Sequence, residues 1–151
     1  MSLFSSQKPL NVWLDEYAIS HQNPTNKRIH WLCVPIIFLC IVALIFLIHP
    51  YLFALIALGV LWFYWRLSVG LFMLMAGFMA ICVAVTMALL GLGLGLWFWV
   101  GVFVVAWIGQ FIGHKIEGAK PSFFEDLQFL LIGPAWVMHD LWRRTSALGR
   151  S

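Results

Sequence analysis

The sequence predicts an all-α membrane protein in which four transmembrane helices are flanked at both ends by cytoplasmic interfacial helices. The first observation is composition, because 63% of the 151 residues are hydrophobic and only 10% are charged, whereas a soluble domain carries about 25% charged residues. The second is the separation of long segments without charge by short polar segments. The length suits a single membrane domain, residues 1–151, and leaves no room for an additional soluble enzyme module.

The four spans are predicted at about 30–48, 50–66, 68–90 and 95–113. The first apolar run has no charged residue and the length of one transmembrane helix. His49-Pro50 interrupts it, and the shorter second run ends at Arg66, whose long side chain can reach the interface. The charge-free stretch that follows is too long for one helix, so we expect a break in the glycine-rich segment 91–95.

Four spans place both termini on one side of the membrane. All nine Lys and Arg residues then share that side, because the connections between spans on the other side contain none. Basic residues mark the cytoplasmic face, so both termini are predicted to be cytoplasmic, in a bacterial inner membrane or the endoplasmic reticulum membrane. Segments 9–22 and 122–144 are predicted to lie at the interface, with a helix break at Gly133-Pro134. The lipid bilayer is an expected partner, and nucleic acid is not.

Four of the five histidines fall on the cytoplasmic side, and two of them flank a turn. Helical spacing places Tyr17 and His21 on one apolar face of the N-terminal segment. Asn23-Pro24 indicates a turn, and Asn26 is expected to cap the first span, which puts His30 in its first helical turn. The chain reversal lets His21 and His30 approach each other, and neutral imidazole is a common metal ligand. The alternative is a pair of ordinary polar residues in an interfacial turn.

A second group of polar residues lies along one stripe at the end of the fourth span. Helical spacing aligns Trp107, Gln110, His114 and Glu117, while the rest of this helix is apolar. An amide inside an apolar run needs a partner, so Gln110 is expected to orient a ligating imidazole without binding the metal itself. Glu117 is a candidate carboxylate ligand beside His114. The alternative is a helix end that reaches the membrane surface.

The third group is His139-Asp140, near the C-terminus. His139 is a further candidate metal ligand, and Asp140 would orient a ligand, although Asp140 could also simply face water beside Arg143. The three groups converge on one face of the membrane and predict a metal site. The ligand types alone leave iron, zinc and copper open.

The same residues resemble the Mpo-like membrane proteins, whose characterised fungal member is an iron-dependent 2-hydroxy fatty acid dioxygenase. The family's first motif, a tyrosine followed by His-x-Asn-Pro-x-Asn-x-x-x-His and Val-Pro, matches Tyr17, His21, Asn23, Pro24, Asn26, His30, Val34 and Pro35. Its second, Trp-x-x-Gln-Phe-x-Gly-His followed by glutamate and proline, matches Trp107, Gln110, Phe111, Gly113, His114, Glu117 and Pro121. A later Asp-Pro pattern matches Asp126 and Pro134. The resemblance covers nearly the whole chain.

The resemblance implies an Fe²⁺-dependent dioxygenase that takes a long-chain 2-hydroxy fatty acid and O₂. Alpha-oxidation of this kind shortens the acid by one carbon and releases CO₂. His21, His30 and His114 would be the catalytic metal ligands, joined by Glu117 and His139, with Tyr17, Asn26, Gln110 and Asp140 around them. The substrate carboxylate would be held by one or more of the basic residues near the site, which are Lys27, Arg28 and Lys115.

Two alternatives of other classes stay open at this point. One is a haem-binding membrane redox protein, which would need histidines within facing spans. The other is a non-enzymatic channel or membrane-shaping protein. Transporters usually carry ionisable residues in the middle of the membrane, and residues 67–113 contain none that is charged.

Overall fold

The chain is described by a computed structural model over residues 8–124 and 128–148. All regular structure within these ranges is helical. The elements are α1 (Leu10–Ile19), α2 (Pro24–Ile48), α3 (Pro50–Leu67), α4 (Val69–Gly91), α5 (Leu96–Glu117), the short 3₁₀ helix η1 (Ser122–Phe124) and α6 (Phe129–Leu148). Asp126 lies outside the described residues.

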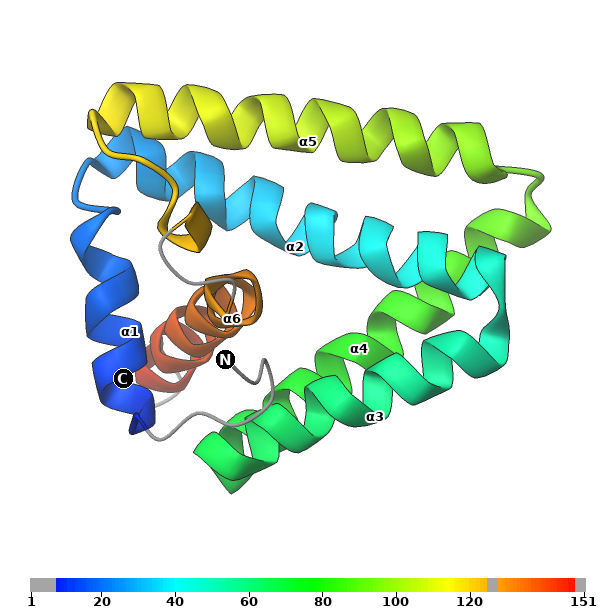
Figure 1. Ribbon diagram of the computed structural model, residues 1–151, viewed down its shortest axis with the longest axis horizontal. Helices are drawn as coiled ribbons and strands as arrows, with labels where there is room; N and C mark the ends of the chain where they lie inside the picture. Colours follow the sequence, from blue (N-terminus) through cyan, green and yellow to red (C-terminus); the bar gives the residue numbers. More distant parts are fainter. Residues whose placement is uncertain (1–7, 125–127, 149–151) are drawn as a thin grey trace.

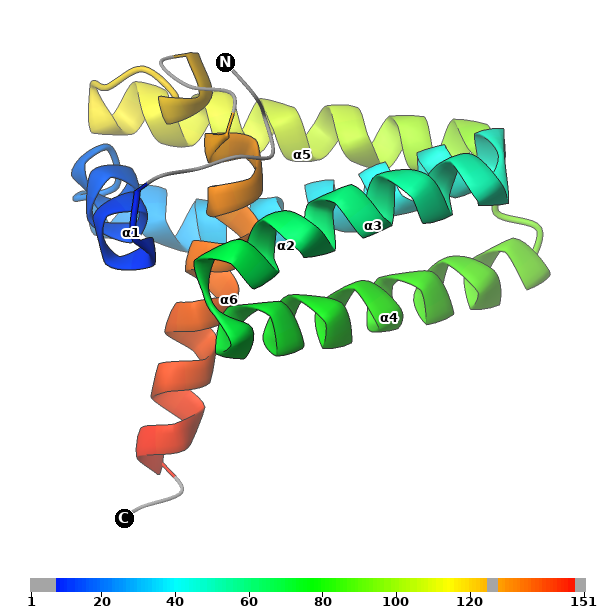
Figure 2. The same cartoon turned by 60° about the horizontal axis from the view of Figure 1, so that its bottom comes forward.

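Four of these helices, α2 to α5, are long and apolar enough to cross a membrane. The predicted all-α fold with four apolar spans is therefore confirmed. Helices α2 and α5 lie side by side over most of their length, and α3 and α4 form a second pair (Figures 1 and 2). Helix α1 lies beside the end of the α2–α5 pair where α2 begins and α5 ends, toward the left of Figure 1, and α6 crosses close to this end.

The turns at the opposite end of the bundle form where the sequence predicts them. His49 adopts an extended conformation between α2 and α3, its Nδ1 atom accepts a hydrogen bond from the Tyr51 amide at 3.3 Å, and Pro50 is the first residue of α3. Proline is favoured at this position because its fixed φ suits a helix start. Helix α4 ends at Gly91, and Gly93 has a φ of 85°, a left-handed conformation that glycine adopts without strain.

Helix α2 begins at Pro24, earlier than the predicted start near residue 30. The prediction that Asn26 caps this helix is wrong, because Asn23 is the cap. Its side chain accepts hydrogen bonds from the amides of Thr25 at 2.8 Å and Asn26 at 3.5 Å, and Pro24 supplies the first helical residue. Asn26 is consequently buried inside the helix, and His30 lies in the second turn, not the first.

Helix α6 runs without a break from Phe129 to Leu148, so the predicted interruption at Gly133-Pro134 is wrong. Proline cannot donate a hydrogen bond to the carbonyl four residues earlier, here that of Leu130. The next carbonyl, that of Leu131, accepts a hydrogen bond from the Tyr64 hydroxyl at 2.8 Å. This bond does not replace the one that Pro134 cannot make, but it fastens the same turn of α6 to α3. The helix contacts α1, α2 and α4 and is seen nearly end-on in Figure 1.

The hydrophobic core fixes α1 against α6. Trp13 and Tyr17, on the face that the sequence predicts to be apolar, are buried against Phe129 and Ile132 of α6. The rings of Trp13 and Phe129 meet edge to face with centroids 5.1 Å apart, a favourable geometry for aromatic pairs. This contact holds the end of α1, and with it His21, beside the N-terminal half of α2.

Candidate metal centre

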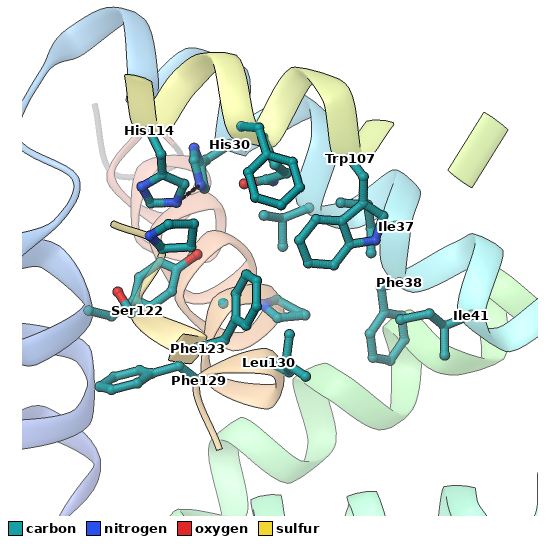
Figure 3. A pocket seen from close by; sticks show the side chains of 17 residues that line it. His30, Ile37, Phe38, Ile41, Trp107, His114, Ser122, Phe123, Phe129 and Leu130 are labelled. Carbon is teal, nitrogen blue, oxygen red and sulfur yellow. Dashed lines mark hydrogen bonds between the residues drawn. The ribbon is translucent and has the colours of Figure 1, made fainter. Parts of the chain in front are cut away.

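Three histidines from three segments meet where α1, α2 and α5 come together. His21 follows α1, His30 lies on α2 and His114 lies on α5, and all three side chains are buried. The centroids of their rings are 4.2 Å apart for His21 and His30, 4.7 Å for His30 and His114, and 5.1 Å for His21 and His114. Their candidate ligand nitrogens lie within 4.8 Å of one another. Figure 3 shows His30 and His114 side by side at one end of a pocket.

Hydrogen bonds to backbone carbonyls fix the orientation of two of these rings. Nδ1 of His21 lies 2.7 Å from the Tyr17 carbonyl oxygen, and Nδ1 of His30 lies 3.0 Å from that of Asn26. A carbonyl oxygen only accepts hydrogen bonds, so each Nδ1 carries the proton and each Nε2 presents a lone pair. Metal-binding histidines are usually oriented in this way.

The Nε2 atoms of the three histidines lie close together. The Nε2 atoms of His30 and His114 are 3.1 Å apart, and the buried Nε2 of His21 has no hydrogen-bond partner among the described residues. Two nitrogens that bind one metal at about 2.1 Å would be about 3.0–3.4 Å apart in octahedral or tetrahedral geometry. The histidine set therefore fits a divalent transition metal.

Burial keeps His21 in the form that binds metal. Loss of hydration is the main cause that lowers the pKa of His21 to about 4, and the nearby His114 lowers this pKa further. The imidazole is therefore neutral at physiological pH and its Nε2 lone pair is available. Neutral imidazole is a ligand shared by iron, zinc, copper and nickel.

Two contacts hold His21 in place, and the sequence gives a reason to expect only the first. The Tyr17 ring stacks on the His21 ring, with centroids 4.2 Å apart and an interplanar angle of 16°. Ser20 Oγ lies 3.1 Å from His21 Nδ1 and 2.5 Å from Ser122 Oγ, which links the end of α1 to η1. Ser20 and Ser122 are 102 positions apart, and no local pattern marks their contact.

Glu117 does not join the histidine group. Its Oε1 atom accepts a hydrogen bond from the Gln22 amide at 2.8 Å, and its Oε2 atom accepts from the Asn23 amide at 2.8 Å and from Asn26 Nδ2 at 3.0 Å. Both carboxylate oxygens are thus engaged by the turn between α1 and α2. Glu117 ties the C-terminal end of α5 to the segment that carries His21.

Glycines on α5 allow the close approach to α2 that brings His30 and His114 together. A Cβ atom at Gly113 would collide with Asn26 Oδ1 and lie 3.4 Å from His30 Cε1. A Cβ atom at Gly109 would lie 2.7 Å from Cys33 Sγ. Small residues four apart are typical of closely packed membrane helices, so this spacing was a visible signal in the sequence.

Gln110 is buried next to His30 and interacts with it through its side chain. Its Nε2 atom has no hydrogen-bond partner within the described part of the chain. The Gln110 amide therefore lies beside the histidine group with an N–H donor available, and it lines the pocket described below.

The other sequence-predicted residues lie elsewhere. His139 lines a separate hollow between α4 and α6, and Asp140 forms an ion pair with Arg144 at 3.2 Å. Arg28 and Lys115 are exposed, and Lys27 lines a polar hollow that also includes His139. The structure thus brings His21, His30 and His114 together with Tyr17, Asn26 and Gln110 around them, and it leaves the remaining predicted residues outside this group.

A pocket opens directly beside the histidines. Its polar lining, which consists of Tyr17, His30, Gln110, His114 and Ser122, meets an apolar wall from α2, α5, η1 and α6. The empty space, measured out to and including the open mouth, is about 630 Å³. Figure 3 shows His30, His114 and Ser122 toward one end and Trp107, Phe38 and Ile41 toward the other.

Comparison with known proteins gives one family. Searches among curated proteins and among solved structures find no match. A family model described as "2-hydroxy-palmitic acid dioxygenase Mpo1-like" matches residues 7–145. The matched range includes all three histidines of the candidate metal centre and nearly the whole sequence. The chain therefore belongs to the Mpo1-like family.

Proposed function

We propose that the protein is an Fe(II)-dependent dioxygenase that shortens 2-hydroxy fatty acids by one carbon. The observation that carries the proposal is the convergence of three buried histidines, two of them with Nε2 fixed as the free nitrogen, beside a largely apolar pocket. The family description agrees with this chemistry. The reaction R–CHOH–COOH + O₂ → R–COOH + CO₂ + H₂O balances in atoms and electrons, so no further reductant is needed.

The chain's own residues would perform distinct tasks around the metal. His21, His30 and His114 would hold Fe²⁺, and this ion would supply the redox chemistry with O₂. The Tyr17 and Asn26 carbonyls keep two of the imidazoles in the ligating tautomer. Burial of the three histidines excludes bulk water from the reacting end of the pocket.

Recognition of the substrate carboxylate falls to neutral groups in this proposal. None of Lys27, Arg28 and Lys115 lines the pocket beside the histidines. The polar side chains that do are Tyr17, Gln110 and Ser122. Burial raises the pKa of the Tyr17 hydroxyl above its ordinary value, so this group stays protonated and can donate a hydrogen bond to an anionic substrate.

We also propose a membrane setting with both termini in the cytoplasm. The four apolar helices support residence in a bilayer, and the placement of Lys and Arg supports this orientation. The histidine group would then lie near the cytoplasmic interface, where the carboxylate of a membrane-dissolved fatty acid also resides. Iron and O₂ would reach the site from the same side.

Turnover by purified protein tests the proposal. Protein freed of metal and reloaded with Fe²⁺ under anaerobic conditions is mixed with 2-hydroxypalmitic acid and O₂. We expect pentadecanoic acid and CO₂ in equal amounts, with equivalent O₂ uptake. Zn²⁺-loaded protein and palmitic acid, which lacks the 2-hydroxyl, are the matched controls and should give no product. Iron-loaded protein that converts no 2-hydroxy acid of any chain length would contradict the proposal.

A further inference from the structure

We propose that the acyl tail of the substrate enters sideways from the bilayer through an opening bordered by Ile41, Phe111 and Leu130. The tail then lies along α2 with the carboxylate end at His30 and His114. This inference rests on the proposed function, because it specifies how the same pocket receives its substrate. Three features of the pocket carry it, namely its polarity, its mouth and its length.

Polarity is graded along the pocket. The polar side chains gather around the histidines, whereas the wall provided by α2 continues with Val34, Ile37 and Phe38, which are each 7–8% exposed. Phe38 is held in place by stacking on Phe78, with centroids 5.2 Å apart. No Lys, Arg, Asp or Glu lines the pocket in the described part of the chain. A molecule with one polar end and a long apolar end matches this gradient.

The mouth of the pocket lies among exposed apolar side chains. Ile41 is 40% exposed, Leu130 is 45% exposed and Phe111 is 50% exposed, and each belongs to a different helix. Ile41 and Phe111 lie on α2 and α5, which are apolar enough to cross a membrane, and exposed apolar residues on such helices face lipid. The opening therefore meets hydrocarbon chains, and an acyl tail can pass through it without contact with water.

The length of the pocket matches the depth of one membrane leaflet. Ile41 follows His30 by 11 positions on α2, a rise of about 16 Å, and the whole hydrocarbon core is about 30 Å thick. A fatty acid in a leaflet has its carboxylate at the surface and its tail end near the midplane, so it has the same depth and direction as in the pocket. An acid that reached the pocket through water would have to leave the bilayer first. Each methylene group of its tail would then lower the aqueous concentration of the acid about fourfold.

The opening extends along the pocket from Phe111, three residues before His114 on α5, to Ile41, 11 residues after His30 on α2, so it is open to lipid at its deep end. Methylene groups that extend past Ile41 remain in lipid and meet no closed end. The enzyme is therefore expected to accept acids longer than the pocket with similar efficiency. Obstruction of the mouth should harm long-chain substrates and spare short, water-soluble 2-hydroxy acids, which can reach the histidines without their tails passing through lipid.

The test uses full-length protein in lipid vesicles and two variants of the mouth, Ile41→Trp and Leu130→Trp. Ile108→Trp is the control, because Ile108 is 53% exposed on α5 but does not line the pocket. The measured quantity is the ratio of kcat/KM for 2-hydroxypalmitic acid to kcat/KM for 2-hydroxyhexanoic acid. We expect the ratio to fall about tenfold or more, the discrimination that a pocket achieves over a single methylene group, in the mouth variants and not in Ile108→Trp.

A second readout does not depend on iron or turnover. 2-Hydroxypalmitic acid with a diazirine at the tail end is irradiated with metal-free protein in vesicles, and the labelled peptides are mapped. Labelling around Ile41 and Leu130, reduced in the mouth variants and unchanged in Ile108→Trp, supports the lateral path. An unchanged kinetic ratio together with labelling elsewhere would overturn it. Wild-type protein that is labelled at the mouth but converts no 2-hydroxy acid would refute the proposed function alone.

Discussion

Replacement of Glu117 by glutamine separates a positioning role from a ligand role. Glu117 accepts two hydrogen bonds from the turn that precedes α2 and a third from Asn26 in the first turn of α2, and the preceding turn carries His21. An amide in place of the carboxylate keeps Asn23 and Asn26 as donors to its remaining oxygen. Its NH₂ group then faces the Gln22 amide, so one hydrogen bond is lost and the other two lose their charge assistance.

The magnitude follows from these contacts. Hydrogen bonds to charged groups contribute about 1.5–3 kcal/mol and neutral ones about 0.5–1.5 kcal/mol. Glu117 is only half-buried, so we take a loss of about 1.5–2 kcal/mol from the low end of these ranges. If that energy holds His21 in its ligating position, metal affinity should fall about ten- to thirtyfold.

Competition with a chelating dye measures the affinity of the purified protein for Zn²⁺ or Fe²⁺. Glu16→Gln is the control, because it also removes one carboxylate but breaks only the surface ion pair with Lys8 at 2.9 Å; its metal affinity should stay within about twofold of wild type. A loss in Glu117→Gln as complete as in His114→Ala would show that the carboxylate is itself a ligand. An unchanged affinity would show that the turn does not need it.

Three further substitutions test the surroundings of the histidine group. Gly113→Ala should lower both thermal stability and metal content, because the new Cβ collides with Asn26. In the control Gly101→Ala the new Cβ meets no neighbouring atom, and the helix should be stabilised by about 1 kcal/mol. Equal melting temperatures of the two variants would contradict the role of Gly113. Gln110→Leu should stay folded and lose about 10–100-fold in turnover, and wild-type turnover would remove Gln110 from the site. Tyr17→Phe keeps the stacked ring and the carbonyl, so metal content should persist. KM for the 2-hydroxy acid should rise about 12- to 150-fold, the equivalent of one hydrogen bond to a charged group. An unchanged KM would exclude contact between the Tyr17 hydroxyl and the substrate.

The spans and the histidine group could be predicted from the sequence because their signals are local. Charge-free runs define α2 to α5, and His49-Pro50 and Gly91 mark the turns. Helical spacing put Gln110 and His114 on one face of α5, and both are buried there. The placement of Lys and Arg at one end of the spans also predicts that His21, His30 and His114 lie at the same end.

The errors arose where distant residues decide the local structure. Asn26 looked like a helix cap, but Asn23 and Pro24 start the helix earlier and Asn26 instead donates to Glu117. Pro134 looked like a helix break, but contacts with other helices stabilise α6 around it, including the hydrogen bond from Tyr64 to a residue 67 positions away. The positions of Glu117 and His139 likewise depend on packing between helices, which spacing along one helix does not specify.

We propose that His21, His30 and His114 together bind one ferrous ion. The direct test is anaerobic titration of detergent-purified, metal-free protein with Fe²⁺. His49→Ala is the control, because His49 lies at the opposite end of α2. The rise per residue of the helix places it about 29 Å from His30. We expect one bound ion per chain in wild type and in His49→Ala. Binding should be lost in each of the variants His21→Ala, His30→Ala and His114→Ala. Tight ferrous binding that survives all three substitutions, or no binding by the wild-type protein, would contradict it.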